Sequence, residues 1–111
     1  MPVPCPIPLR LKEARTQKKL TQQQLGMLLD LDQNNASARV NQYERGKHTP
    51  DYDTLKRIAD VLELPVTYFY CEDDLEAKIL CAMHHLSPAQ RRLCSLLLTH
   101  SVGKRTSWLG N

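Results

Sequence analysis

The side chains with the most reactive chemistry in this chain are four cysteines and four histidines. Cys81 and His84 stand three residues apart, so on a helix they would share one face and could act as a pair of metal ligands. The wider set matches no standard zinc spacing, however, and the adjacent His84 and His85 cannot both point the same way. We therefore predict no metal site and interpret Cys81 and Cys94 as small core residues. The residues considered for that site are Cys81, His84, His85, Cys94 and His100.

Other kinds of catalytic chemistry have no recognisable motif either. The chain shows no Gly-rich phosphate loop, no paired carboxylates in a recognisable setting and no nucleophile motif. Its apolar runs are far shorter than the roughly 20 residues needed to cross a bilayer, and the first residues do not resemble a signal peptide. We therefore expect a cytoplasmic protein that is not an enzyme, uses no cofactor and has no membrane partner.

The composition indicates a small all-α fold. The 111 residues suffice for one compact domain with an appendage. Apolar residues make up 41% of the chain but aromatic residues only 5%, so the core must be built mainly from aliphatic side chains, as in small helical domains. The net charge of +3 permits a nucleic-acid partner without requiring one.

Residues 9–70 carry the signals of five short helices. An amphipathic pattern covers 9–19, and Thr21 with Gln24 forms a capping box that begins a second helix at about Gln22. After a polar turn, a third helix is expected to start between residues 33 and 37 and to run to Arg45. A fourth helix and a short closing turn or helix complete the set, over about 51–62 and 65–70.

The flanking segments are expected to differ from this domain. Four prolines alternate through residues 1–8 and predict an extended arm, so the first helix should begin only after Pro8. Residues 71–100 contain two amphipathic stretches, the second with a capping box at Ser87, and predict a C-terminal helical hairpin. Residues 101–111 lack periodicity and predict a flexible tail.

Several short motifs occur in a fixed order and are specific enough to suggest a family. They are Leu11-Lys-Glu-Ala-Arg15, Leu20-Thr-Gln22, Leu25-Gly-Met-Leu-Leu29, Val40-Asn-Gln-Tyr-Glu-Arg-Gly-Lys47, Pro50 and Leu55-Lys-Arg-Ile-Ala-Asp-Val-Leu62. Together they resemble the Cro and phage-repressor (xenobiotic-response-element) type of helix-turn-helix proteins, over residues 7–70. The resemblance implies a five-helix, lambda-repressor-like domain whose third helix reads double-stranded DNA in the major groove.

The resemblance also implies roles for individual residues. Gly26 matches a small residue that lets the third helix cross the second closely, and Val40 and Tyr43 match buried anchors. Arg15 and Glu44 match a structural ion pair. Base reading is expected from the start and exposed face of the third helix, at Asn34, Asn35, Ser37, Ala38, Arg39, Asn41 and Gln42; in general, Arg pairs with guanine and Asn or Gln with adenine. Phosphate contacts are expected from Gln22, Arg45, Lys47 and His48.

One departure from the family pattern concerns the segment between Leu25 and Glu44, which is four residues longer than the commonest spacing. Asp30 also stands where a turn glycine is usual. Four residues are about one helical turn, so either the turn is enlarged or the third helix gains a turn at its start. We favour the longer helix, and Asn34 and Asn35 are included among the base readers on that condition.

The C-terminal hairpin has more apolar residues than the DNA-binding core should need. Because helix-turn-helix proteins commonly bind two half-sites as two-fold dimers, we predict a homodimer whose interface includes Leu75, Ile79, Met83, Leu93, Leu96 and Leu97. The alternative is a hairpin that folds back on its own domain. The resulting hypothesis is a dimeric repressor that binds a palindromic operator. The competing hypothesis is an antitoxin-like or anti-repressor-like module whose hairpin holds a protein partner and whose DNA binding serves autoregulation.

Overall fold

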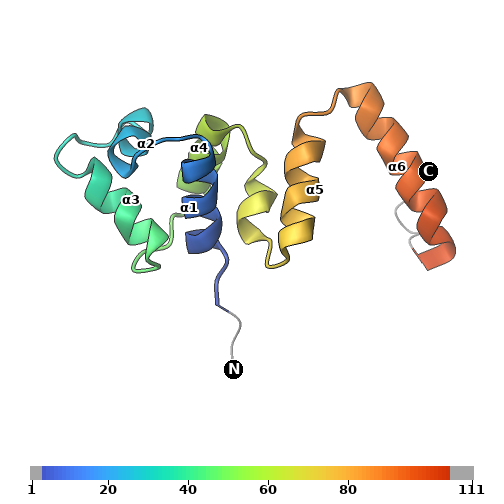
Figure 1. Ribbon diagram of the computed structural model, residues 1–111, viewed down its shortest axis with the longest axis horizontal. Helices are drawn as coiled ribbons and strands as arrows, with labels where there is room; N and C mark the ends of the chain where they lie inside the picture. Colours follow the sequence, from blue (N-terminus) through green and yellow to red (C-terminus); the bar gives the residue numbers. More distant parts are fainter. Residues whose placement is uncertain (1–3, 106–111) are drawn as a thin grey trace. The chain divides into compact units, whose positions relative to one another are not determined.

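The computed structural model describes residues 4–105, and every regular element in that range is helical, as the composition predicted. Figure 1 shows the order of the elements, which are α1 (Ile7–Gln17), α2 (Gln22–Leu28), α3 (Ala36–Glu44), α4 (Tyr52–Leu62), the 3-10 helix η1 (Val66–Tyr70), α5 (Asp74–His84) and α6 (Pro88–Val102). The chain divides into two compact units, an N-terminal unit of residues 1–81 and a C-terminal unit of residues 82–111. Within residues 4–105 no helix is long and apolar enough to span a bilayer.

Side-chain caps fix where three of the helices begin. The Thr21 hydroxyl accepts a hydrogen bond from the Gln24 amide at 3.0 Å, and the Gln24 side chain accepts one from the Thr21 amide at 2.8 Å. This reciprocal capping box confirms the predicted start of α2. Ser87 and Gln90 repeat the arrangement at α6, and Asp51 caps α4 by accepting from the Thr54 amide at 2.8 Å.

The core of the N-terminal unit is largely aliphatic. α1 packs against α3 and η1, and η1 also packs against α4. Val40 and Tyr43 on α3 are both buried, as the family resemblance implied. The largest fully buried apolar side chains come from α1, α2, α3, α4 and η1, and they are Leu11, Leu25, Val40, Leu55, Ile58, Leu62 and Phe69. Burying these side chains is the main stabilising contribution to the unit.

Two predicted boundaries at the ends of the chain are wrong. α1 begins at Ile7 rather than after Pro8, so the predicted extended arm over residues 1–8 is too long. Proline is tolerated in the first turn of a helix, where its missing N–H would have no intrahelical acceptor. At the other end α6 continues to Val102 and a short 3-10 turn follows over residues 103–105. The rest of the predicted tail, residues 106–111, lies outside the described residues.

The N-terminal unit also extends further than the predicted domain of residues 9–70. Ala77 on α5 is buried in its core, and Leu80 and Cys81 pack partly buried against it. One face of α5 therefore belongs to the core of the N-terminal unit, which the interpretation of residues 71–100 as a separate hairpin did not foresee. The opposite face of α5 carries Leu75 and Ile79, and both of these side chains are exposed.

A buried arginine joins α1 to the start of α5. The Arg10 side chain is only 1% exposed, and its guanidinium donates to the Cys71 carbonyl at 2.9 Å and to Asp74 Oδ1 at 2.9 Å. It also pairs with Glu13 at 3.2 Å and lies 5.7 Å from the centre of the Tyr68 ring. Burial alone would lower the pKa of Arg10, but the hydrogen bonds to Asp74 and Glu13 outweigh that effect and raise it. Arg10 therefore stays charged and holds the start of α5 on the N-terminal unit.

Candidate nucleic-acid interface

The position of α3 depends on its close packing against α2. A Cβ atom built on Gly26 of α2 would lie 2.5 Å from the Ala36 Cβ and 2.8 Å from two Ala36 backbone atoms. No real side chain tolerates such distances, so only glycine allows this crossing. The structure thus gives the physical reason for the small residue that the family resemblance implies at this position.

The face of α3 opposite its buried residues is directed toward solvent. Ala36, Val40 and Tyr43 anchor the inner face. Of the predicted base readers on this helix, Ala38 and Arg39 are exposed, whereas Ser37, Asn41 and Gln42 are half-buried. A helix held along one side that presents arginine and amide side chains on the other has the form needed to enter a major groove.

A polar network fixes the start of α2 and the end of α3 to α1. The Arg15 guanidinium forms a two-point ion pair with Glu44, at 2.5 Å from Nε to Oε2 and 3.0 Å from Nη2 to Oε1. The Glu44 side chain is only 3% exposed and that of Arg15 12%, so the pair is largely shielded from water. Arg15 also donates to the Leu20 carbonyl at 2.8 Å. Two-point geometry with an additional carbonyl acceptor is what a shielded pair needs to offset desolvation.

The side chain of Gln22, a predicted phosphate contact, also belongs to this network. Its side-chain Nε2 donates to Glu44 Oε1 at 3.1 Å and to Asn41 Oδ1 at 3.2 Å. Both side-chain N–H groups of Gln22 are therefore directed at protein acceptors, and a phosphate contact by that side chain would require them to turn away. The same hydrogen bond holds the Asn41 side chain, whereas no hydrogen bond of the network involves Gln42, so Asn41 is partly engaged within the protein.

Ion pairing separates the ten Lys and Arg residues within positions 1–70 into two sets. Those that form ion pairs with carboxylates are Arg10, Arg15, Lys18, Lys56 and Arg57. The described part of the chain holds no ion-pair partner for the remaining five, which are all exposed: Lys12, Lys19, Arg39, Arg45 and Lys47. Exposed cations without a carboxylate partner are available to phosphate groups, whereas the first set is already neutralised.

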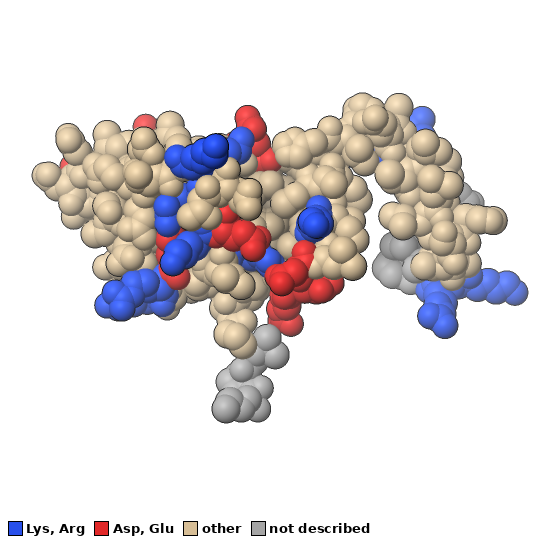
Figure 2. Space-filling model, viewed as in Figure 1, with Lys and Arg blue, Asp and Glu red and all other residues tan. Residues whose placement is uncertain are grey.

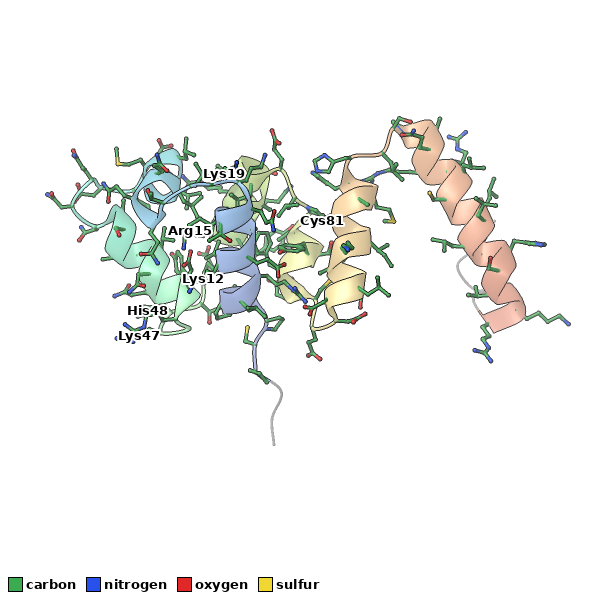
Figure 3. All side chains as sticks on the ribbon, viewed as in Figure 1. Lys12, Arg15, Lys19, Lys47, His48 and Cys81 are labelled. Carbon is green, nitrogen blue, oxygen red and sulfur yellow. The ribbon has the colours of Figure 1, made fainter. Side chains whose placement is uncertain are left out.

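The five unpaired cations come from neighbouring elements. Lys12 lies on α1, Lys19 lies two residues after the end of that helix, and Lys47 lies after α3 (Figure 3). A Cβ on Gly46 would lie 3.5 Å from Pro8 Cγ, so the turn that carries Lys47 and His48 runs beside the start of α1. Figure 2, in which all Lys and Arg are blue, shows some of them over α1 and near the end of α3 and others over α5 and α6. The sequence reasoning missed Lys12 and Lys19, because their lack of a carboxylate partner is visible only in the structure.

The extra residues between α2 and α3 enlarge the turn, so the favoured prediction of a longer recognition helix is wrong. α3 begins at Ala36, and residues 29–35 form a hydrogen-bonded turn. Asp30 adopts a left-handed conformation with φ of 59°, at the position where the family usually has glycine. The Asp32 carboxylate accepts from the Asn35 side chain at 3.1 Å, and the Gln23 side chain donates to the Gln33 carbonyl at 3.2 Å.

This turn alters the status of two predicted base readers. Asn34 and Asn35 were included only if the helix were extended, and both lie in the turn instead. The Asn35 side chain is engaged with Asp32. Asn34 is exposed at the tip of the segment leading into α3.

The cysteine and histidine residues do not gather into a ligand set. Among residues 4–105 no group of three or more His, Cys, Asp or Glu side chains is placed to hold a metal ion. His84 and His85 pack edge to face with ring centres 5.5 Å apart. Burial raises the pKa values of both Cys71 and Cys81, which keeps these thiols protonated and unreactive.

Comparison with known proteins agrees with this geometry. Residues 11–69, more than half of the chain, match the family model described as Helix-turn-helix. The chain is also similar to the solved structure titled "Crystal structure of transcriptional regulator BswR", with a TM-score of 0.79 and 37% sequence identity over 85% of this chain and 93% of that one. A comparison with curated proteins found no match. The chain belongs to the helix-turn-helix family of the Cro and phage-repressor (xenobiotic-response-element) type.

Proposed function

We propose that this protein is a sequence-specific DNA-binding transcriptional regulator. The observation that carries the proposal is the division of the ten cations within residues 1–70: five form ion pairs with carboxylates, and five exposed ones without such a partner in the described residues lie on α1, on α3 and shortly after them, where Gly26 and Glu44 anchor α3. Family membership and the similarity to a structure titled as a transcriptional regulator support the same function. Nothing in this arrangement calls for catalysis or a cofactor.

Within this function the residues divide by role. Arg39 and Gln42, with Ser37 and Ala38 beside them, are proposed to read base edges from the start and outer face of α3. Lys12, Lys19, Arg45, Lys47 and His48 are proposed to contact phosphates on either side of the groove. Gln22 is assigned to the internal network, where it positions α2 and α3 relative to each other.

The regulator is further proposed to act as a homodimer on a palindromic operator and to repress by occluding a promoter. A single recognition helix contacts only a few base pairs, so two-fold pairing of half-sites is the usual way to reach operator-length specificity. The proposed dimer interface consists of apolar side chains on α5 and α6 that the chain itself leaves exposed or half-buried, and they are Leu75, Ile79, Met83, Leu93, Leu96 and Leu97.

The proposal is tested by selecting bound sequences from random duplex DNA, with the molar mass of the complex measured on the same sample. A palindromic consensus with half-sites about one helical turn apart and two chains per site is expected. If no sequence is enriched over salt-sensitive background binding, the regulator function is refuted. That outcome would favour a module that binds a protein partner instead.

Two substitutions then test the residue roles. Arg39→Ala should cost about 1–3 kcal/mol on the selected operator and relax the preference at one base position. Lys47→Ala should weaken binding to all sequences alike and reduce the salt slope by about one. Lys56→Ala is the matched control, because Lys56 is exposed but already paired with Asp60 at 3.0 Å and should leave both quantities unchanged.

A further inference from the structure

Two helices of this chain expose apolar faces that its own core does not use. On α5, Leu75 and Ile79 stand four residues apart on one face and are 64% and 50% exposed. On α6, Leu93, Leu96 and Leu97 recur at helical spacing and are all exposed, and α6 has no buried residue among those described. Exposed apolar faces of this kind mark interaction surfaces.

The charges around the two faces have opposite sign. Four acids stand between positions 72 and 76, and two of them have structural tasks: Asp74 pairs with Arg10, and Asp73 accepts from the Glu76 amide at 3.2 Å. Glu72 and Glu76 remain exposed, with no ion pair in the described part of the chain, and Lys78 on the same helix is exposed too. Negative charges therefore outnumber positive ones around the exposed face of α5. Figure 2 shows carboxylates gathered at the beginning of α5.

The C-terminal unit carries charge of the opposite sign. Residues 82–111 contain no Asp or Glu, whereas Arg91, Arg92, Lys104 and Arg105 are all basic and exposed. Arg91 donates to the Met83 carbonyl at 3.2 Å, which leaves Arg92, Lys104 and Arg105 as cations with no hydrogen bond or ion pair in residues 4–105. The leucines of α6 are thus bordered only by positive charge.

We infer that α6 of one copy packs on the exposed face of α5 of a second copy, and that the reverse contact completes a two-fold dimer. Pairing α5 with α5 would bring acids together, and pairing α6 with α6 would bring cations together, each at a cost in electrostatic free energy. Only the unlike pairing buries both apolar faces and matches their charges. In a two-fold dimer that contact occurs twice. The inference rests on the proposed function for the homodimer and adds which surfaces meet.

This arrangement would place the dimer contact on the same compact unit as α3, the helix proposed to read DNA. α5 is fixed to the N-terminal unit by the buried Arg10 and by Ala77. A partner helix that docks on α5 therefore docks on an element of the N-terminal unit, and within that unit α1 packs on α3.

Complementary charge reversal tests the inference. One variant, Glu72→Lys with Glu76→Lys, makes the border of the α5 face positive; the other, Arg92→Glu with Lys104→Glu, makes the border of α6 negative. Each alone should weaken self-association by at least about tenfold, because each homodimer then pairs like charges twice. An equimolar mixture should form a one-to-one heterodimer, in which both contacts are again complementary. Asp53→Lys, an exposed charge reversal on α4, is the control and should associate like the unchanged protein.

Sedimentation equilibrium of the separate variants and of the mixture distinguishes the outcomes. Association that is recovered only on mixing supports the contact between α6 of one copy and α5 of the other. The inference is overturned if either variant alone dimerises as well as the unchanged protein, or if the mixture stays monomeric. These outcomes include the case in which α6 pairs with α5 of its own chain. If the unchanged protein stays monomeric on its selected operator, the homodimer itself fails. Sequence-selective binding in that same assay would still uphold the DNA-binding function.

Discussion

Helices α4 and α6 show how one sequence pattern can lead to two different environments. α4 has eleven residues and buries Leu55, Ile58, Ala59 and Leu62 at spacings of three and four. α6 has fifteen residues and an equally clear cap, yet none of its described residues is buried. The difference is that α4 contributes to the core of the N-terminal unit and packs against η1, whereas the leucines of α6 are exposed. Periodicity therefore identifies a helix, and the surrounding structure decides what its apolar face meets.

The largest expected effect tests this difference between α4 and α6 directly. Leu55→Ala should destabilise the protein by about 2–5 kcal/mol, because Leu55 is fully buried and its truncation leaves a cavity. Leu96→Ala, at a leucine 60% exposed, should change the stability of the monomer little. Denaturant unfolding at several protein concentrations checks both. The Leu96→Ala effect should increase with concentration as dimers form, and a loss independent of concentration would show that α6 is buried within its own chain.

A second prediction concerns the polar network rather than the core. Glu44→Gln keeps the shape of the side chain but removes its charge, and should cost about 1.5–3 kcal/mol because the largely shielded Arg15 loses its carboxylate partner. Lys18→Gln breaks the exposed pair with Glu63 and should cost less than about 1 kcal/mol. Chemical unfolding of the two variants gives the comparison. Equal losses would mean that the burial of Glu44 adds nothing to the strength of its pair.

The elements themselves could be predicted because their signals are local. The capping boxes at Thr21 and Ser87 and the period of Leu55 to Leu62 all reside in short windows of sequence. The placement of the four extra residues before α3 could not be predicted, because a helix turn and an enlarged loop use similar polar residues. The decision depended on the left-handed φ of Asp30 and on the hydrogen bond from the Asn35 side chain to the Asp32 carboxylate, both of which are defined only once the chain has folded.

The candidate site was predictable only in part for a related reason. The family resemblance implied roles for Arg39 and Lys47 by position, but long-range partners decide which cations are free. Gln22 is turned inward by Glu44, which is 22 residues away, and Lys18 is neutralised by Glu63, which is 45 residues away. Lys19, adjacent to Lys18, has no such partner in the described residues. No local sequence window separates these two lysines.

A third prediction uses the two glycines that differ most in their surroundings. Gly26→Ala forces a Cβ to within 2.5 Å of Ala36, so α2 and α3 must separate; the expected cost is about 1–3 kcal/mol, with weaker operator binding. Gly103→Ala, at the end of α6, meets no atom within 4 Å, and its cost of about 1–3 kcal/mol should come only from the strained backbone, with φ of 61° and ψ of −133°. Thermal unfolding and operator titration check both. Unchanged operator affinity in Gly26→Ala would show that reading does not depend on the α2–α3 crossing.

The smallest expected effect compares the caps of α4 and α6 by their response to pH. Hydrogen bonds from Thr54, from its side chain and then its backbone, lower the pKa of Asp51 below its usual 3.8. A lowered folded-state pKa means that the carboxylate form stabilises the fold above about pH 3.8, and that this contribution is lost as the pH falls through the lower, folded-state value. Ser87 does not titrate, so the cap of α6 has no such dependence.

Asp51→Ala should therefore lower the melting temperature modestly at pH 7, and its difference from the unchanged protein should shrink as the solution is acidified below pH 3.8. Ser87→Ala should reduce the helical content of α6 by the same amount at both pH values. Circular dichroism melts at the two pH values measure both differences. A pH-independent deficit in Asp51→Ala would show that the Asp51 side chain stabilises α4 by packing rather than as a charged cap. The starts of α4 and α6 would then differ only in packing, since α4 has buried residues and α6 has none among those described.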